Sequence, residues 1–291
     1  MLRDSWRFAA GMSAIIASAL VLTQLDKLLL SRLLTLEVFG YYMLANVVTN
    51  GLYIFINPVF DALFPRLSVL AAAGDTRGVR ETYHNGTQAL ATLVLPPATM
   101  LTLFASPLLR MWTGSPEAAR QTAPIVSLLA VGTAVNGLMH APYALQLAHG
   151  WTTLGLRINL CLIAVVAPAV ALTALYWGST GAAAVWVGAN LAYLAAGLPL
   201  THRRLLPGST ARWLLADVGR PLVAALTTAG VGRSILGSAT SPGHTLAVLL
   251  TVGTGAFAAA ALAAPRIRFW LLARSHQWVG RSLGRSDRRE P

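Results

Sequence analysis

Charged residues are scarce in this sequence. Only 11% of its 291 residues are charged, 55% are hydrophobic, and the mean hydropathy is +0.61. A soluble domain carries roughly 25% charged residues, so this chain has too few to coat a water-facing surface. The apolar residues form several runs of about 20 residues, the length that a helix needs to cross the hydrocarbon core of a bilayer. The sequence therefore excludes an ordinary soluble enzyme and predicts an all-α, polytopic membrane protein.

Cysteine and acidic residues are also scarce. Cys161 is the only cysteine, so no intrachain disulfide can form, and no Cys/His cluster has the spacing of a metal site. The ten acidic residues are mostly in short loops, and no two of them form a plausible catalytic pair. The sequence contains neither a nucleophile elbow nor a phosphate-binding loop. We therefore expect no enzymatic activity, no catalytic residue, no cofactor and no bound metal.

The basic residues are almost all arginines, and they give a formal net charge of +12. Lys27 is the only lysine among the 22 basic residues. The arginines lie at the ends of the apolar runs and in the last stretch of chain, as in proteins that face anionic lipid. We therefore expect membrane lipids as partners and no binding of nucleic acid.

The apolar runs predict about eight transmembrane helices. Their expected ranges are residues 8–30, 38–60, 86–109, 122–147, 156–176, 180–200, 221–236 and 245–264. A tight turn at Trp177–Ser179 separates the fifth span from the sixth. Ala17–Ala19 resembles a signal-peptide cleavage site, but the apolar character continues beyond it, which favours a retained first helix. We expect a six-helix bundle over residues 1–205, two additional helices over 206–265, and a basic cytoplasmic tail over 266–291.

The arginine distribution predicts the orientation. Seventeen basic residues fall on the side of the N-terminus and five on the other, and positive residues stay cytoplasmic. Both termini should therefore be cytoplasmic. Residues 65–85, in which leucines and valines alternate with arginines, predict an amphipathic surface helix on the cytoplasmic face. The tail from Arg266 should begin as an interfacial helix and end as a disordered, arginine-rich segment.

Several polar residues lie inside the apolar runs, where they must face a cavity or another helix. Gln24, Asp26 and Lys27 lie in the first span. Further along the chain, the spacing of four residues puts Asn46 with Asn50, and Asn136 with His140, on shared helix faces. Asn159 completes this set. The neutral residues either line a substrate path or form interhelical hydrogen bonds, and Asp26 and Lys27 either face a cavity or lie at the headgroups, with Lys27 snorkelling.

Four stretches of sequence resemble a known family. They are Thr23–Leu34 with Phe39–Tyr42, Leu63–Ser68 with Gly74–Asp75, Tyr143–Thr152, and Pro199–Arg204. They are similar to the polysaccharide-biosynthesis flippases, of the Wzx type, in the multidrug/oligosaccharidyl-lipid/polysaccharide exporter superfamily. The resemblance covers most of the chain but only the second half of the family's fold. Family members have two six-helix bundles that face each other across a cavity, often followed by two more helices.

This resemblance implies a function. Such a protein moves a polyprenyl-diphosphate-linked oligosaccharide across the bacterial inner membrane during O-antigen, capsule or exopolysaccharide assembly. Lys27, Arg66 and Arg157 are candidates for contact with the diphosphate, while Asn and Gln side chains suit sugar hydroxyls. The implied partners are the lipid-linked oligosaccharide and, as alternatives for a protein partner, a missing N-terminal half, a second copy or a polysaccharide polymerase.

Two other functions compete with this one. A cation-coupled multidrug exporter of the same superfamily would need acidic residues deep in the cavity, and only Asp26 and Asp61 come near that. A non-transporting scaffold of the polysaccharide assembly machinery is the other alternative. A membrane glycosyltransferase or polymerase would need a sizeable aqueous loop with carboxylates, which the short predicted loops do not supply.

Overall fold

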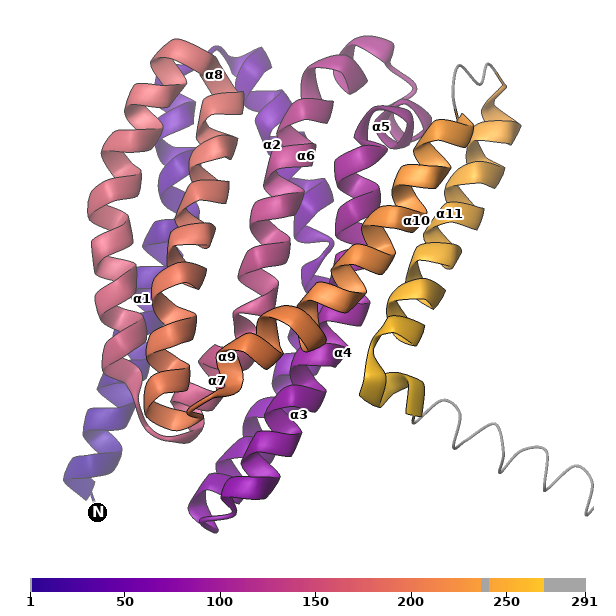
Figure 1. Cartoon of the computed structure of the whole chain (residues 1–291). Helices are drawn as coiled ribbons and strands as arrows, with labels where there is room; N and C mark the ends of the chain where they lie inside the picture. Colours follow the sequence, from indigo (N-terminus) through magenta and orange to yellow (C-terminus); the bar gives the residue numbers. More distant parts are fainter. Residues whose placement is uncertain (1, 237–240, 270–291) are drawn as a thin grey trace, which may run out of the picture.

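The chain folds into helices joined by short turns (Figure 1). A computed structural model describes residues 2–236 and 241–269, and this part of the chain contains no β-strand. It confirms the predicted all-α class. The first six elements are α1 (Leu2–Leu33), α2 (Leu36–Asn50), α3 (Tyr53–Ala72), α4 (Thr76–Leu103), α5 (Ala105–Thr113) and α6 (Pro116–Leu138). The others are α7 (His140–Ala148), α8 (Thr152–Leu205), α9 (Ser209–Arg212), a π-helix η1 (Trp213–Gly219), α10 (Arg220–Leu236) and α11 (Pro242–Ala263).

The helices are long and apolar enough for a multi-pass membrane protein. Six of the described helical segments could each cross a bilayer, and α4 and α5, bent by 81° at their junction, could make a seventh span. The 54 residues of α8 supply two passes rather than one, because the helix breaks at Gly178 with a left-handed φ of 59°. Figure 1 shows α8 doubling back at this point. Counted with this break, the described residues contain eight segments that could each cross a bilayer, and the predicted turn at Trp177–Ser179 is confirmed.

Two predicted spans are less regular than expected. The span predicted at 38–60 is divided into α2 and α3 by a turn at Gly51 and Leu52. The span predicted at 86–109 bends after Leu103, and its last residues belong to α5. Neither break has a strong sequence signal, since Gly51 is one glycine among many in the apolar runs.

The prediction of a surface helix over residues 65–85 is wrong. α3 continues through Pro65 to Ala72, and α4 begins at Thr76, so these residues form the tip of a helical hairpin. Gly74 turns the chain with a φ of 70°, and the Asp75 carboxylate caps α4 by accepting a hydrogen bond from the Gly78 amide at 2.8 Å. Leu67 and Val79 of this segment are buried in the protein core, whereas Val69 is 69% exposed.

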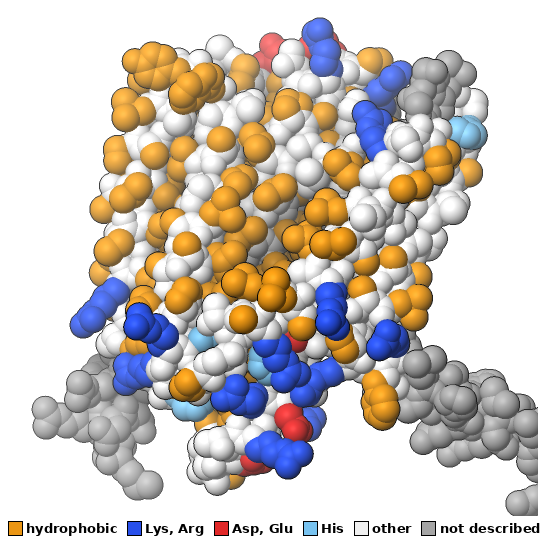
Figure 2. Space-filling model, viewed as in Figure 1, with side chains coloured by type: hydrophobic (Ala, Val, Ile, Leu, Met, Phe, Trp, Pro, Cys, Tyr) orange, Lys and Arg blue, Asp and Glu red, His pale blue; other side chains and the backbone are white. Residues whose placement is uncertain are grey.

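The surface has the banding of a membrane protein. Figure 2 shows hydrophobic side chains spread over the middle of the molecule, with arginine and lysine side chains gathered towards its two ends. Figure 1 places the start of α1 and the end of α11 at the same end of the bundle. The predicted disordered tail lies largely outside the described residues, because the description ends at Phe269.

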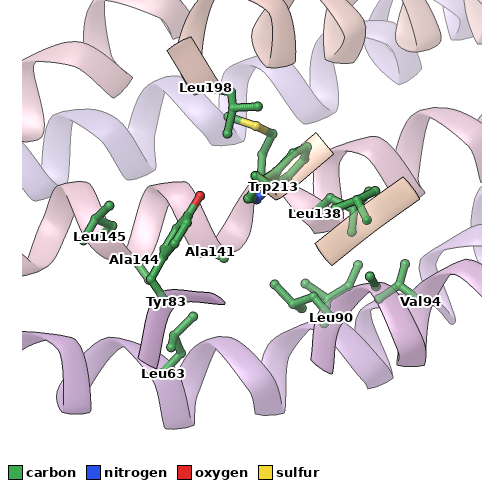
Figure 3. Close-up of a cluster of buried hydrophobic side chains, with 14 of the residues drawn as sticks. Leu63, Tyr83, Leu90, Val94, Leu138, Ala141, Ala144, Leu145, Leu198 and Trp213 are labelled. Atoms are coloured by element: carbon green, nitrogen blue, oxygen red, sulfur yellow. The ribbon is translucent and has the colours of Figure 1, made fainter. Parts of the chain in front are cut away.

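A large apolar core joins the α3–α4 hairpin to the rest of the bundle (Figure 3). Tyr83 of α4 and Trp213 of η1 are fully or almost fully buried, and both belong to this cluster. Leu63 packs so closely on Gly86 that a Cβ there would come within 2.6 Å of it. At the other end of the molecule, a smaller cluster containing Phe104 and Leu249 packs α10 and α11 against α4. A further cluster, which includes Leu30, Tyr42, Ile125 and Val166, packs α1, α2, α6 and α8 against one another, and these helices line most of the candidate site.

Candidate functional site

Two adjoining cavities collect most of the predicted site residues. The first, of about 290 Å³, is lined by Gln24, Asp26, Lys27, Asn46 and Asn50 among others. The second, of about 300 Å³, is lined by residues that include Asn136, His140 and Asn159. Both cavities are also lined by Thr23, Tyr53 and Trp186, so they form one polar tract between α1, α2, α3, α6 and α8. Eight of the ten predicted residues therefore lie along a single surface.

Asp26 and Lys27, the two charged residues of the set on α1, line the first cavity. The Tyr42 hydroxyl donates to Asp26 Oδ2 at 2.5 Å, and Lys27 Nζ donates to the Thr23 carbonyl oxygen at 2.5 Å. The side chains of Asp26 and Lys27 are only 16% and 22% exposed, and Lys27 Nζ is 3.5 Å from Asp26 Oδ1. That Oδ1 is buried and accepts no hydrogen bond from the described residues. This oxygen therefore faces Lys27 as its ion-pair partner, and the rest of the Asp26 side chain borders the cavity.

The amides of the second cavity are mostly committed to neighbouring helices. Tyr53 Oη donates to Asn136 Oδ1 at 3.1 Å, and Asn136 Nδ2 donates to Asn190 Oδ1 at 2.8 Å. This chain links α3, α6 and the second half of α8. Asn159 Nδ2 likewise donates to Ser18 Oγ of α1 at 3.1 Å. For Asn136 and Asn159, interhelical hydrogen bonding is thus the better description of the two that the sequence leaves open.

His140 contacts both Asn136 and the aromatic rings of Tyr53 and Phe60. Its Nδ1 donates to the Asn136 carbonyl oxygen at 3.1 Å, which puts the proton on Nδ1 and leaves Nε2 as an acceptor. The rings of Tyr53 and Phe60 meet the imidazole edge-on, at centroid distances of 6.2 and 5.7 Å. Phe60 in turn stacks on Tyr143 at 5.8 Å. Aromatic faces beside polar groups suit the two faces of a sugar ring, one apolar and one hydroxylated.

The remaining predicted residues divide into those that line the first cavity and those that lie outside the polar tract. Gln24 and Asn50 line the first cavity with exposed side chains, and Asn46 uses its amide on the Tyr42 carbonyl oxygen at 3.1 Å. Arg66 lines a separate groove between α3 and α4, and Arg157 is exposed on α8. The structure therefore does not bring either predicted arginine to the polar tract. Lys27 is the one predicted cation among the residues that line it.

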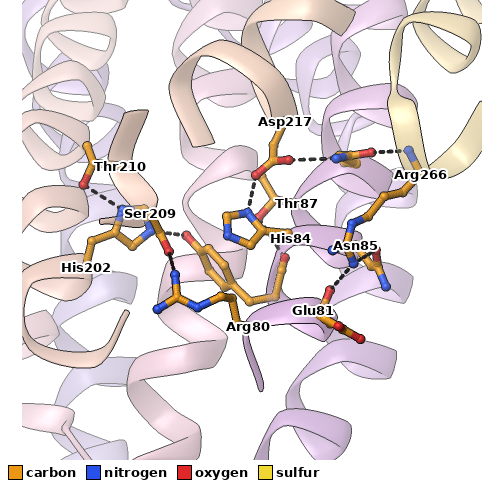
Figure 4. Close-up of polar contacts among 12 residues, drawn as sticks. Arg80, Glu81, His84, Asn85, Thr87, His202, Ser209, Thr210, Asp217 and Arg266 are labelled. Carbon is orange, nitrogen blue, oxygen red and sulfur yellow. Dashed lines mark hydrogen bonds and ion pairs between the residues drawn. The ribbon is translucent and has the colours of Figure 1, made fainter. Parts of the chain in front are cut away.

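A second polar cluster, which the sequence analysis did not predict, joins α4 to the C-terminal helices (Figure 4). His84 and Asp217 are both fully buried, and His84 Nδ1 donates to Asp217 Oδ2. Gln88 Nε2 donates to Asp217 Oδ1 at 2.7 Å, and the Arg266 backbone amide donates to Gln88 Oε1 at 3.0 Å. The only available signal was Asp217 itself, a single acidic residue in the apolar stretch 213–218.

A neighbouring group of hydrogen bonds extends this cluster. The Tyr83 hydroxyl lies 2.8 Å from His202 Nε2, and His202 Nδ1 lies 3.0 Å from Thr210 Oγ1. Arg80 donates to Ser209 Oγ at 2.8 Å. Tyr83 and Arg80 thus connect α4 to the end of α8 and to α9, and His202 connects α8 to α9, so the cluster holds these parts of the fold together. It opens onto neither of the two cavities.

The side chains of the polar tract can form hydrogen bonds with a ligand and stack on it. The tract offers amide groups, aromatic faces and one aspartate–lysine pair whose formal charges cancel. The described part of the chain contains no group of three or more His, Cys, Asp or Glu side chains that could hold a metal ion. A surface of this kind fits a neutral polyhydroxylated ligand better than a strongly charged one.

A comparison with known protein families matches the N-terminal part of the chain, which contains the first cavity's predicted residues. Residues 1–116, from α1 to the start of α6, match the model of a family described as polysaccharide biosynthesis protein. The match confirms the predicted resemblance to polysaccharide-biosynthesis proteins and supports a role in polysaccharide synthesis or export. It includes all five predicted residues of the first cavity. A search of curated proteins finds no match to this chain.

Proposed function

From the family match and the polar tract together, we propose that the chain helps to move a polyprenyl-diphosphate-linked oligosaccharide across the bacterial inner membrane, with both of its termini in the cytoplasm. The tract forms one wall of the pathway. Cytoplasmic termini agree with the excess of basic residues on that side of the sequence. The transported unit serves polysaccharide assembly, and the chain itself performs no covalent chemistry.

The observation that carries this proposal is the Asp26–Lys27 pair in the wall of the first cavity. Placing a carboxylate inside a membrane helix costs about 2.5–3.5 kcal/mol on the insertion scale, so it is retained where it has a use. Asp26 Oδ1 is buried beside the cavity and accepts no hydrogen bond from the described residues. The side chains of Asp26 and Lys27 are 16% and 22% exposed beside this cavity, where sugar hydroxyls can contact them. The exposed amides of Gln24 and Asn50 supply further hydrogen bonds along the same wall.

The arrangement also bears on where the diphosphate travels. Lys27 is held to its own helix by the Thr23 carbonyl oxygen and neutralised by Asp26. Two phosphate groups need more positive charge than this one neutralised lysine supplies. We therefore place the sugars in the tract and the diphosphate nearer the headgroup region, where the polyprenyl chain remains in lipid.

The same charges separate this proposal from a cation-coupled drug exporter. Such an exporter would need an acidic site in the cavity with charge to spare for the coupling ion. Asp26 already has Lys27 as its counter-charge, and Asp61 is exposed and lines neither cavity. The sugar pathway is the function that these residues support best.

The test is genetic and biochemical. In a strain that lacks its polysaccharide flippase, the full-length protein is expressed as wild type, Asp26→Asn or Lys27→Gln, with Arg110→Gln as an exposed control far from the cavity. We expect at least a tenfold loss of surface polymer in both cavity variants, since each removes a charged hydrogen bond worth about 1.5–3 kcal/mol. The control should keep wild-type levels. Wild-type polymer in both cavity variants would refute the proposed pathway.

A reconstituted assay separates transport from scaffolding. Purified protein in liposomes is given a fluorescent lipid-linked oligosaccharide, and the fraction that becomes inaccessible to an external quencher is followed over time. We expect the wild type to change this fraction faster than protein-free liposomes. A protein that restores polymer in cells but never moves the lipid in liposomes is a scaffold, which would overturn the proposal.

A further inference from the structure

A cleft between the C-terminal helices has two arginines at its rim and an apolar interior. It has a volume of about 540 Å³ and lies between the start of α10 and the end of α11. Arg220 and Arg268 line it together with Val223, Leu262 and Ala263. Val223 and Leu262 are 60% and 56% exposed, so the walls are apolar and open to the surroundings. The cleft shares no residue with the two cavities of the polar tract.

The positive charge at the rim has no counter-charge in the described structure. Both arginine side chains are exposed, and neither forms an ion pair with a described carboxylate. Asp217 is three residues before Arg220, but its oxygens already accept from His84 and Gln88. Charge complementarity therefore calls for an anion at the rim.

The rim is also held in place. The turn that carries Arg268 is fastened to α4 by Arg266, whose guanidinium donates to Asn85 Oδ1 at 2.7 Å and to the Glu81 carbonyl oxygen at 3.1 Å. The Arg266 backbone amide is fastened by Gln88. Arg266 is thus committed to the protein, and Arg268, two residues later, is left for a ligand. A site that is already ordered loses less entropy when it binds.

We infer that this cleft is a binding site for an anionic phospholipid, whose phosphate lies between Arg220 and Arg268 and whose acyl chain lies along Val223 and Leu262. Those apolar residues lie within about two helical turns of the arginines, further into the bilayer. Basic pockets between transmembrane helices are known to hold anionic headgroups. The bound lipid completes the apolar surface between α10 and α11, and its site is independent of the transport pathway.

The test uses the full-length protein in nanodiscs that contain equal amounts of phosphatidylglycerol and phosphatidylcholine. Native mass spectrometry then counts the lipids that remain bound after gentle delipidation. We expect wild type to retain phosphatidylglycerol over phosphatidylcholine. The double variant Arg220→Gln/Arg268→Gln should retain it about thirtyfold less well, because each basic residue near an anionic surface contributes about 1 kcal/mol. Arg157→Gln/Arg203→Gln changes the net charge equally outside the cleft and should match wild type.

A second variant tests the cleft itself. Ala263→Phe keeps both arginines but fills the apolar interior, so phosphatidylglycerol should be lost while overall helicity by circular dichroism stays constant. Soluble glycerol phosphate should not compete at millimolar concentration, since it has no acyl chain. Equal retention by wild type and the rim variant would overturn the inference. So would equal losses in the control, displacement by glycerol phosphate, or preferential retention of polyprenyl phosphate when both lipids are offered.

Discussion

The polar tract and the His84–Asp217 cluster place similar side chains in opposite situations. In the cluster, both ionisable side chains are fully buried, and each Asp217 oxygen has a donor. In the tract, Asp26 and Lys27 border a cavity, Asp26 Oδ1 lacks a donor among the described residues, and Gln24 is exposed. His84 Nε2 also lacks a partner among the described residues, so the two regions differ in access: the cluster residues line neither cavity, whereas the tract residues do. The difference assigns stability to the cluster and binding to the tract.

The positions of the two regions strengthen this contrast. The bonds to Asp217 join residues far apart in the sequence, with separations of 133 residues for His84 and 129 for Gln88. They connect α4 to η1, and Gln88 also holds the turn after α11. In the first cavity of the tract the bond from Tyr42 to Asp26 spans only 16 residues, whereas Asn159 of the second cavity bonds to Ser18 over 141 residues. Breaking the cluster should therefore loosen the fold, while changing Asp26 or Lys27 in the first cavity should leave the fold largely intact.

The largest effect is expected at Asp217. Asp217→Ala leaves His84 and Gln88 buried without their acceptor, and removing one member of a buried pair costs about 3–5 kcal/mol of unfolding free energy. Reversible SDS titration of the purified protein in mixed micelles measures this loss. The double variant His84→Leu/Asp217→Leu should be less destabilised than Asp217→Ala, since it leaves no uncompensated charge. A single variant within 1 kcal/mol of wild type would remove the cluster from any structural role.

The His84–Asp217 cluster could not be predicted from the sequence, although much of the fold around it could. The eight spans and the turn at Gly178 could be predicted, because length, apolarity and an isolated glycine between apolar runs are local signals. The hairpin at residues 65–85 could not, because an amphipathic helix has the same pattern whether its apolar face meets lipid or another helix. His84 belongs to that segment, so its burial and its partner 133 residues away were invisible too.

The candidate site was more predictable, for a physical reason. Charged and amide side chains inside apolar runs are costly in lipid, so each one predicts a cavity or a partner wherever it occurs. Asp26, Lys27 and the asparagines could be predicted as candidate site residues for this reason. The sequence does not show which of these residues bind a ligand and which bond to another helix. Asn136 and Asn50 have the same side chain and differ only in whether a neighbouring helix supplies a partner.

A smaller effect is expected where the tract meets the core. Tyr42 is fully buried, and Tyr42→Phe removes the only hydrogen bond to Asp26 from the described residues. We expect a loss of about 1 kcal/mol in the same SDS titration, because side-chain hydrogen bonds inside membrane proteins contribute about 0.6–1.7 kcal/mol. Tyr41→Phe is the matched control, since its bond to Glu37 is exposed. A loss as large as that of Asp217→Ala would make the tract structural and erase the contrast.

The smallest effect is expected at the two arginines that the structure leaves outside the tract. Arg66 lines the groove between α3 and α4, Arg157 is exposed on α8, and neither borders the cavities that Asp26 and Asn136 line. Arg66→Gln and Arg157→Gln should each change stability by less than about 0.5 kcal/mol. Each should also leave surface polymer at the wild-type level in the flippase-deficient strain, because the sugars contact the tract and the diphosphate remains near the headgroups. Loss of polymer in either variant would show that the diphosphate follows the protein wall, and it would return that arginine to the substrate path.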